Sequence, residues 1–484
     1  MAIKDLREYI SRLEEYGELQ RIEAEVDWNF EAGAITRRAN ELGAPAPLMS
    51  RIKGYPEGYA LLGGPVAGSK VKGPKPWRRL AIALEMDPDC SYWEIVEEFK
   101  KRIEQPIKPV IVSDGPCKEN IRTGDQADLY ELPAPMVHDG DGGRYISTWH
   151  FVITKDLDSD WVNWGMYRQM IHNSRDMGGL FLPTQDIGVM YYRKYEANNI
   201  PMPFATAIGP DPISALASCA SYGVGRNEAD LAGGIRRAPV ELIKCETSDI
   251  LVPAHAEIII EGEVLPYKRV DQGPFGEYTG YRSSPRMPRP VYRVKAITFR
   301  NDPILTVANM GVPLDDADIC LSVCGRTDIK TILDNYGFPI TGIHLPPECS
   351  GHMIVVAVQA KYTNIASHIA NAIWGTKLPY PYIVVVDSDV DPYNITEVLH
   401  AIVTKCHPVR GIRAQEFAVG HPLLPFLSLE ERMWGKGAAV LLDCTWPLDW
   451  PKEIAIPRKA SFKEIYPKEI QEKVLNNWKN YGYK

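Results

Sequence analysis

Residues 149–154, WHFVIT, decide the fold of the middle of this 484-residue chain. Their large apolar side chains stand at every second position, and this period predicts a β-strand because successive side chains of a strand point to opposite faces. Two later apolar runs, 256–260 and 291–299, predict further strands, each followed by a turn dipeptide, Glu261-Gly262 or Asn301-Asp302. A central β-rich domain is therefore expected, with a barrel as one option.

Upstream of this domain the pattern is mixed. Apolar residues recur at helical spacing over 5–17, and a second helix is expected over 31–42. Ser91 and Glu94 have the spacing of a capping box and predict the start of a third helix. Prolines then mark a connection near 105–140. The first hundred residues thus predict an α/β unit followed by a linker.

Downstream of about residue 325 helical and strand patterns alternate, which predicts an α/β domain. The expected order is helix 328–336, strand 352–359, helix 364–374, strand 382–386 and helix 396–406. The last fifty residues are rich in aromatic residues and lysine. They predict an extension that packs on another surface, a second subunit being one option.

Composition narrows the class of protein. The net charge of −8 argues against a nucleic-acid-binding surface, for which a basic excess is expected. Nine scattered cysteines without a CxxC pair suit a reducing compartment better than a disulfide framework or zinc site. The chain begins with a charged amphipathic segment, and no apolar run reaches the 18 residues of a membrane span. We expect a cytoplasmic protein that acts on small molecules, with no membrane partner.

Several motif-like stretches lack the residues that their chemistry needs. Residues 63–70 resemble a phosphate loop, but lysine does not directly follow the last glycine. Residues 387–391 imitate the start of a calcium loop but lack its glycine. Residues 138–141 predict a polar turn, with a metal site as the alternative. No GxGxxG follows a strand, so a Rossmann dinucleotide site has no support.

The segment 273–281, GPFGEYTGY, contains three glycines and a proline around one carboxylate. Glycine loses much backbone entropy on folding and proline removes a donor, so such a loop persists where the backbone must take an unusual shape. Glu277 is therefore the first candidate for an acid/base residue. The alternative is a tight turn with an exposed glutamate.

Two further segments carry polar groups of the same kind. In NWGMYR, 163–168, Arg168 is a suitable partner for Glu277 because a guanidinium can hold a carboxylate with two hydrogen bonds; a surface arginine is the alternative. Asn163 and Arg168 are an odd number of positions apart, so a bulge near Gly165 is expected if they share a face. Glu228 precedes a glycine pair in a third segment.

These segments together resemble the UbiD family of prenylated-flavin-dependent decarboxylases, over nearly the whole chain. The segments that carry the resemblance are 163–168, 228–234, 273–281 and 384–391 with the helix that follows. The resemblance implies an α+β, multidomain fold. Its parts would be an N-terminal α/β domain (1–115), a central split β-barrel that binds prenylated FMN (116–310), a linker helix region (311–335) and a C-terminal α/β oligomerisation domain (336–484).

The resemblance also implies a divalent metal, Mn²⁺ or Mg²⁺, with K⁺ at the cofactor phosphate. Asn163 and Glu228 fall at ligand positions, and Asp186 falls where the family ordinarily has a histidine. Two carboxylates would neutralise the divalent charge, so we expect weaker phosphate anchoring or a different reliance on K⁺ and lysine. The other cofactor-binding positions implied are Thr148, Trp164, Arg168, Gln185, Ser218 and Lys377.

For catalysis the family's glutamate–arginine–glutamate network is represented by Gln272, Arg168 and Glu277. Gln272 cannot ionise, so it can only orient its neighbours, and Glu277 is the expected proton donor. Three more residues are candidates for the substrate pocket, with structural roles as the alternative: Asp315, Asp316 and His421.

The implied activity is reversible, non-oxidative decarboxylation of an aromatic or α,β-unsaturated carboxylic acid. The implied partners are that acid and CO₂, a separate prenylated-flavin synthase and further copies of the chain, as a dimer or hexamer. One alternative is a non-catalytic or partly catalytic subunit of a larger carboxylase, similar to phenylphosphate carboxylase; another is ordinary FMN redox chemistry. The presence of Arg168, Glu228 and Glu277 favours the enzyme.

Overall fold

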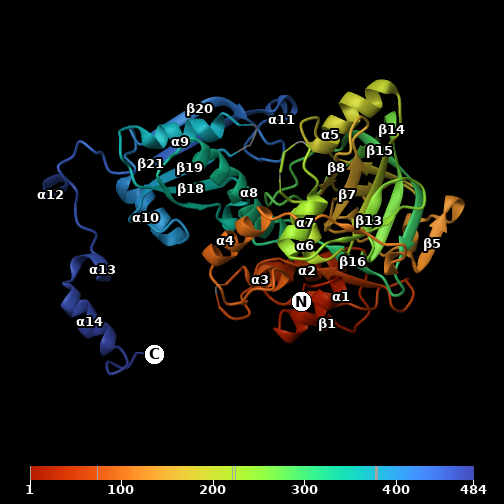
Figure 1. Ribbon diagram of the computed structural model, residues 1–484, viewed down its shortest axis with the longest axis horizontal. Coiled ribbons are helices and arrows are strands. Elements are labelled where there is room, and N and C mark those ends of the chain that lie inside the picture. The colour runs from red at the N-terminus through yellow and green to blue at the C-terminus, as the bar shows by residue number, and fades with distance from the viewer. Residues whose placement is uncertain (1, 74, 221, 224, 377–379, 484) are drawn as a thin grey trace.

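The computed structural model describes residues 2–73, 75–220, 222–223, 225–376 and 380–483. Figure 1 shows an N-terminal unit, a strand-rich central unit and a C-terminal unit, with helix α8 (Asp316–Asn335) at the junction of the last two. A final segment projects away from the C-terminal unit. The expected mixed α/β, multidomain fold is confirmed.

The N-terminal unit contains the three helices expected from apolar periodicity. Asp5 accepts a hydrogen bond from the Glu8 amide and caps the first helix, and the capping box at Ser91 and Glu94 is formed. The helices of this unit are α1 (Leu6–Glu15), α2 (Glu31–Leu42), α3 (Arg78–Ala83) and α4 (Tyr92–Ile103).

The sheet of this unit is completed by a strand from far along the chain. Its order is β1 (Leu19–Ile22), β2 (Ala46–Met49), β3 (Ala60–Gly63) and β16 (Ile304–Val307), and β16 runs parallel to β3. Local periodicity carries no information on such long-range pairing, so the fourth strand was not expected.

The central unit is built on a nine-stranded sheet with the order β6-β9-β10-β15-β14-β11-β7-β8, and β5 pairs with β15. The strands are β5 (Asn120–Thr123), β6 (Tyr145–Ser147), β7 (His150–Lys155), β8 (Val162–Gly165), β9 (Gln169–Ile171), β10 (Asp176–Gly179), β11 (Met202–Ile208), β14 (Ile258–Gln272) and β15 (Met287–Phe299).

This sheet curls into an open barrel. Strand β8 stands at one end of the order and β9 next to the other end, yet only residues 166–168 connect them. Because each residue spans at most about 3.6 Å, the two ends must lie close together. Among the described residues β6 and β8 share no ladder. Gln169 Oε1 accepts hydrogen bonds from the hydroxyl of Ser147 on the adjacent strand β6 (2.8 Å) and from that of Thr206 on β11, which is not a neighbour of β9 in the sheet (3.0 Å).

Both faces of strand β7 are buried. Phe151 and Ile153 pack in the core that includes helices α6 (Pro212–Ala217) and α7 (Glu228–Arg236), whereas Val152 belongs to the second core inside the curled sheet. The turn expected at Glu261-Gly262 is wrong, because this dipeptide lies within β14 at a register shift against β15. A glycine in a strand marks a bulge as readily as a turn.

The remaining elements of the first 300 residues are short. The connection expected near 105–140 contains strand β4 (Val110–Ile111) and strand β5. Strand β4 pairs with β12 (Glu241–Lys244), which also pairs with β13 (Leu251–Pro253). Helix α5 (Asp186–Met190) follows strand β10. The segment near 105–140 therefore also contributes strands to two sheets.

The C-terminal unit is a five-stranded sheet with helices on both faces. Helices α8 and α9 (Ile365–Trp374) pack on one face and α10 (Ile395–Lys405) on the other. The sheet order is β17 (Ile340–His344), β18 (Met353–Val358), β19 (Tyr382–Asp387), β21 (Lys436–Cys444) and β20 (Ile412–Val419). Helices α9 and α10 and strands β18 and β19 are confirmed, whereas the helix expected at 328–336 is only the last part of α8.

The end of the chain makes little contact with the rest. Helix α11 (Leu429–Trp434) precedes β21, and α12 (Lys452–Ala455), α13 (Phe462–Ile465) and α14 (Lys468–Asn476) follow it along the projecting segment (Figure 1). Neither α13 nor α14 buries a side chain, and Leu475 is 63% exposed. None of the helices in the described parts of the chain has the length and apolar character needed to span a bilayer.

Candidate active site

The loop between β14 and β15, residues 273–286 and here named the Glu277 loop, takes a shape that its glycines allow. Gly273 has a φ of 89°, which strains any residue with a side chain. A Cβ at Gly276 would lie 2.6 Å from the His138 ring. The Gly276 amide instead donates to Asp141 Oδ1 at 3.0 Å, and Asp141 also accepts from His138. The polar turn at 138–141 thus contacts this loop and holds it on one side.

Glu277 lies in the interior and forms an ion pair with Arg168. The two side chains are 5% and 8% exposed, so the alternatives of an exposed glutamate and a surface arginine are wrong. Arg168 Nη2 donates to Ser284 Oγ at 2.9 Å, and the guanidinium lies 5.4 Å from the Phe275 ring centroid. Burial lowers the pKa of Arg168 to about 10, which leaves it charged at neutral pH. The arrangement can exchange a proton at Glu277 and hold a second carboxylate at Arg168.

Arg168 reaches this position without the expected bulge. Strand β8 pairs with β7 in unbroken register and ends at Gly165, so the bulge near Gly165 is wrong. Arg168 lies in the connection to β9, where strand alternation no longer applies. Gly165 is needed for a different reason, because a Cβ there would lie 2.5 Å from the Tyr167 ring.

Gln272 is buried at the end of β14 and stabilises the base of the loop. Its Nε2 donates to the Tyr145 hydroxyl at 3.0 Å, and this hydroxyl donates to the Pro274 carbonyl at 3.2 Å. The Tyr145 ring packs on Phe275 with centroids 4.2 Å apart. Burial raises the pKa of Tyr145, so both partners are neutral at physiological pH. Glu277 is therefore the titratable carboxylate of the three positions inferred from the resemblance.

A second polar cluster lies at the edge of β8. Glu228, at the start of α7, accepts a hydrogen bond from the Trp164 amide at 2.8 Å, and Asn163 Nδ2 donates to the Tyr167 hydroxyl at 3.5 Å. Burial raises the pKa of Glu228 to about 8, and the Asp186 carboxylate acts in the same direction. Within the described residues no group of three His, Cys, Asp or Glu side chains is placed to hold a metal. The polar side chains of this cluster include two carboxylates, Glu228 and Asp186, and the Asn163 amide.

The other residues inferred as cofactor-binding make local contacts. Thr148 Oγ1 accepts from the Ala308 amide, Gln185 Oε1 accepts from the Leu182 amide, and Ser218 Oγ donates to the Ala215 carbonyl, at 3.1, 2.7 and 2.7 Å. The Trp164 ring stacks on Phe151 with centroids 4.4 Å apart. Lys377 lies outside the described residues.

Of the three residues predicted for the substrate pocket, Asp315 and Asp316 make structural contacts, and His421 lies beside the Glu277 loop. Asp315 caps helix α8 and forms an ion pair with Arg37 at 3.7 Å, and Asp316 Oδ1 accepts from the Val66 amide at 2.7 Å, so both connect α8 to the N-terminal unit. Burial raises the pKa of Asp315 to about 6 and that of Asp316 to about 7. His421 instead lies 3.5 Å from the Tyr278 hydroxyl and contacts the Glu277 loop.

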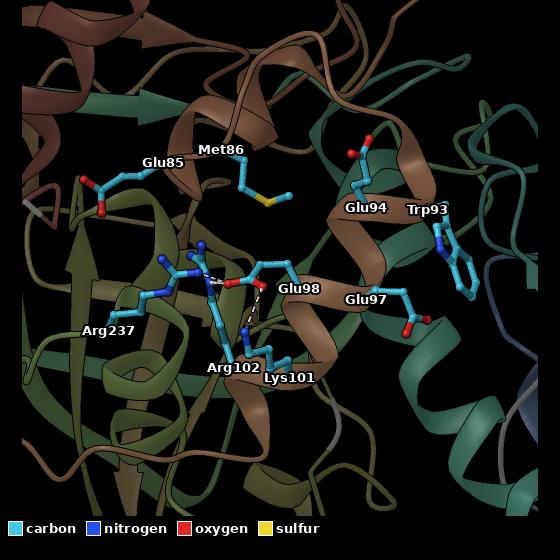
Figure 2. A pocket seen from close by; sticks show the side chains of 9 residues that line it. All are labelled: Glu85, Met86, Trp93, Glu94, Glu97, Glu98, Lys101, Arg102 and Arg237. Atoms are coloured by element: carbon cyan, nitrogen blue, oxygen red, sulfur yellow. Dashed lines mark hydrogen bonds and ion pairs between the residues drawn. The ribbon is translucent and has the colours of Figure 1, made fainter.

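A cavity of about 520 Å³ lies elsewhere, beside helix α4 (Figure 2). Glu98 occupies its middle, where it pairs with Lys101 at 3.8 Å, with Arg102 at 2.8 Å and with Arg237. Glu98 is therefore already paired within this cavity, and none of the site residues inferred from sequence lines it. The Arg168–Glu277 pair therefore remains the candidate active site.

Comparison with known families identifies the class of protein. Residues 10–99, 108–313 and 323–444 match the N-terminal, Rift-related and C-terminal domains of 3-octaprenyl-4-hydroxybenzoate carboxy-lyase. Ferulic acid decarboxylase 1 of Saccharomyces cerevisiae is 32% identical over 499 residues, which cover 99% of this chain and 98% of the relative. The chain belongs to the UbiD family of carboxy-lyases.

Solved structures agree over the full length. The closed form of vanillic acid decarboxylase from Sedimentibacter hydroxybenzoicus has a TM-score of 0.86 at 28% identity, covering 99% of this chain and all of that one; two open forms score 0.83 and 0.82. The UbiD-class enzyme HmfF from Pelotomaculum thermopropionicum, in complex with FMN, has a TM-score of 0.80 at 30% identity, covering 94% and 97%. Whole-length similarity to decarboxylases favours an enzyme over a non-catalytic subunit.

Proposed function

We propose that this protein is a reversible decarboxylase of an aromatic or α,β-unsaturated carboxylic acid that uses prenylated FMN. The observation that carries the proposal is the buried ion pair between Arg168 and Glu277, a residue of the glycine-rich loop. Relatives named for ferulic acid and vanillic acid support the substrate class, and HmfF structures with FMN and with prenylated FMN support the cofactor.

Glu277 carries the proton in this proposal. When CO₂ leaves the substrate, the carbon that bore the carboxylate needs one proton, and the Glu277 carboxyl group supplies it and is recharged from solvent. Arg168 holds the Glu277 carboxylate or that of the substrate, and Gln272 orients Tyr145. A bound prenylated flavin supplies the electrophilic carbon and the electron sink. The reverse exchange of proton and CO₂ at the same site gives carboxylation.

Asn163, Asp186 and Glu228 are the residues that would hold Mn²⁺ or Mg²⁺, with K⁺ beside it, at the cofactor phosphate. Carboxylate and amide oxygens are the ligands that these hard cations prefer. The raised pKa of Glu228 supports the assignment, because its burial, and to a lesser extent the neighbouring Asp186 carboxylate, disfavour its charged form and a cation reverses this effect.

The C-terminal domain, 336–484, would assemble copies of the chain. Apolar side chains lie exposed along the projecting segment, and a segment so poorly buried gains stability when another surface covers it. We therefore place a second copy against this segment. The most exposed of the large apolar residues there are Ile454, Leu475, Tyr481 and Tyr483.

The function is tested by producing the protein together with a prenylated-flavin synthase. Purified protein should show flavin absorbance and should release CO₂ from at least one member of a panel that includes ferulic, vanillic and hydroxybenzoic acids. Identification of the decarboxylated product by mass spectrometry completes the assay. Absence of bound flavin, or flavin-loaded protein that leaves every acid intact and exchanges no CO₂, would overturn the proposal.

A further inference from the structure

The Glu277 loop is held from two sides, and the second side belongs to the C-terminal unit. Thr279 Oγ1 donates to the Leu423 carbonyl at 3.2 Å, and the Tyr278 hydroxyl lies 3.5 Å from His421 Nε2. Arg432 Nη1 donates to the Ser283 carbonyl at 2.6 Å. Three contacts therefore join this loop to the segment between β20 and β21.

Arg432 is also held by contacts within the C-terminal unit. It lies on α11, which begins at a capping box formed by Ser428 and Glu431, and its Nη2 donates to the Pro425 carbonyl at 2.8 Å. Figure 1 shows α11 at the top of the molecule, between the C-terminal sheet and the central strands. One guanidinium thus spans the two units with both ends bonded to backbone carbonyls.

Aromatic rings fill the space beside these bonds. The Tyr278 ring stacks on His352 at a centroid distance of 5.7 Å, and His421 lies at 6.1 Å from Tyr278 and 5.5 Å from His352. His352 lies just before β18 and His421 just after β20, so both belong to the C-terminal unit.

These contacts flank the two charged groups of the site. Thr279 is two residues from Glu277, and Ser283 precedes Ser284, the hydroxyl that accepts a hydrogen bond from Arg168. A loop with glycines at 273, 276 and 280 loses much entropy when it is ordered, so bonds from outside the loop must offset that cost. A shift of about 1 Å in a catalytic group can lower a rate roughly a hundredfold.

We propose that Arg432 and Thr279 are positioning residues: the C-terminal unit clamps the Glu277 loop and thereby sets the place of Glu277 against Arg168. The predicted effect of the clamp on the reaction rate depends on the proposed function, whereas its predicted effect on the order of the loop does not. The pair is then fully assembled only while the central and C-terminal units are in contact.

The test compares Arg432→Ala and Thr279→Val with Arg413→Ala. Arg413 is a matched control because its Nη2 donates to Asn371 Oδ1 at 3.0 Å within the C-terminal unit. Amide hydrogen exchange of the peptide that covers the Glu277 loop is measured by mass spectrometry, since the Glu277 and Gly280 amides are hydrogen-bonded within it. We expect exchange there to be roughly tenfold faster in Arg432→Ala, less so in Thr279→Val, and unchanged in Arg413→Ala.

On flavin-loaded enzyme we expect kcat to fall roughly tenfold to a hundredfold in Arg432→Ala while KM stays within a factor of about two, because the clamp places Glu277 rather than the substrate. Arg432→Lys, which can reach one carbonyl, should recover part of kcat. Unchanged loop exchange in Arg432→Ala, or an equal rise in Arg413→Ala, would overturn the clamp. An inactive wild type would refute the proposed function instead, and the exchange measurement would still decide the clamp.

Discussion

Two buried carboxylates of the central unit, Glu277 and Glu228, differ in what neutralises them. Glu277 is paired with Arg168, a cation of the same chain. Glu228 has the Trp164 amide and a second carboxylate, Asp186, as neighbours, and burial raises its pKa to about 8. Burying a carboxylate without a cation is costly. Glu277 is therefore neutralised within the protein itself, whereas Glu228 is the carboxylate for which we propose a bound cation.

The largest effect is expected from Glu277→Gln. The amide preserves shape and one hydrogen bond to Arg168 but cannot transfer a proton, so we expect turnover and CO₂ exchange to fall by roughly 10³-fold or more. Flavin content, read from the visible absorbance spectrum, should match wild type because the change lies in the Arg168–Glu277 pair and not among the residues proposed to hold the cofactor phosphate. Retained CO₂ exchange in this variant would reject the proton-donor role.

Arg168→Ala tests the other member of the Arg168–Glu277 ion pair. The variant leaves the Glu277 carboxylate buried without its cation, which costs about 3–5 kcal/mol of unfolding free energy for a buried pair. Chemical denaturation of the cofactor-free protein at neutral pH measures this cost. The double variant Arg168→Ala/Glu277→Gln should recover part of the loss. If Arg168→Ala is as stable as wild type, the pair is not held as a buried ion pair in solution.

Sequence and structure agree where the evidence is local. Helix α2 has the bounds that apolar spacing predicted, and the capping box at Ser91 is formed. Strand β16 was missed because its pairing partner, β3, lies far away in the sequence. The turn placed at Glu261-Gly262 failed because a glycine within a long buried strand marks a bulge as well as a turn.

The sequence predicted which residues belong to the candidate site, but only part of how they are arranged. The glycines of the Glu277 loop identified a fixed carboxylate, and Arg168 followed from its chemistry. The partners that place both groups, Asp141 and Ser284, were not expected as parts of the site, because each acts through a contact between distant segments. The turn at 138–141 was noticed, but no local pattern shows which loop a polar turn holds.

A smaller effect is expected at the proposed cation site around Glu228. Because a ligand that binds only the folded state adds RT ln(1 + [L]/Kd), Mn²⁺ at a hundred times its Kd should stabilise wild-type protein by about 2.7 kcal/mol. Glu228→Gln removes one charged ligand and should lose most of this gain, whereas Glu277→Gln should keep it. Thermal unfolding with and without Mn²⁺, read by calorimetry, compares the two variants. An equal Mn²⁺ effect in both would place the cation elsewhere.

The smallest effect is expected from Asp186→His, which replaces a carboxylate with the ligand type inferred for the family. A neutral imidazole leaves the bound divalent cation with one more unit of positive charge for an anionic phosphate. We therefore expect FMN to bind a few-fold more tightly to the Mn²⁺-loaded variant than to wild type, and riboflavin, which lacks the phosphate, to bind both alike. Fluorescence titration of each flavin gives the two ratios. A gain for riboflavin as large as that for FMN would show that residue 186 acts on the ring system, and the contrast between Glu228 and Glu277 would then not rest on a cation at the phosphate.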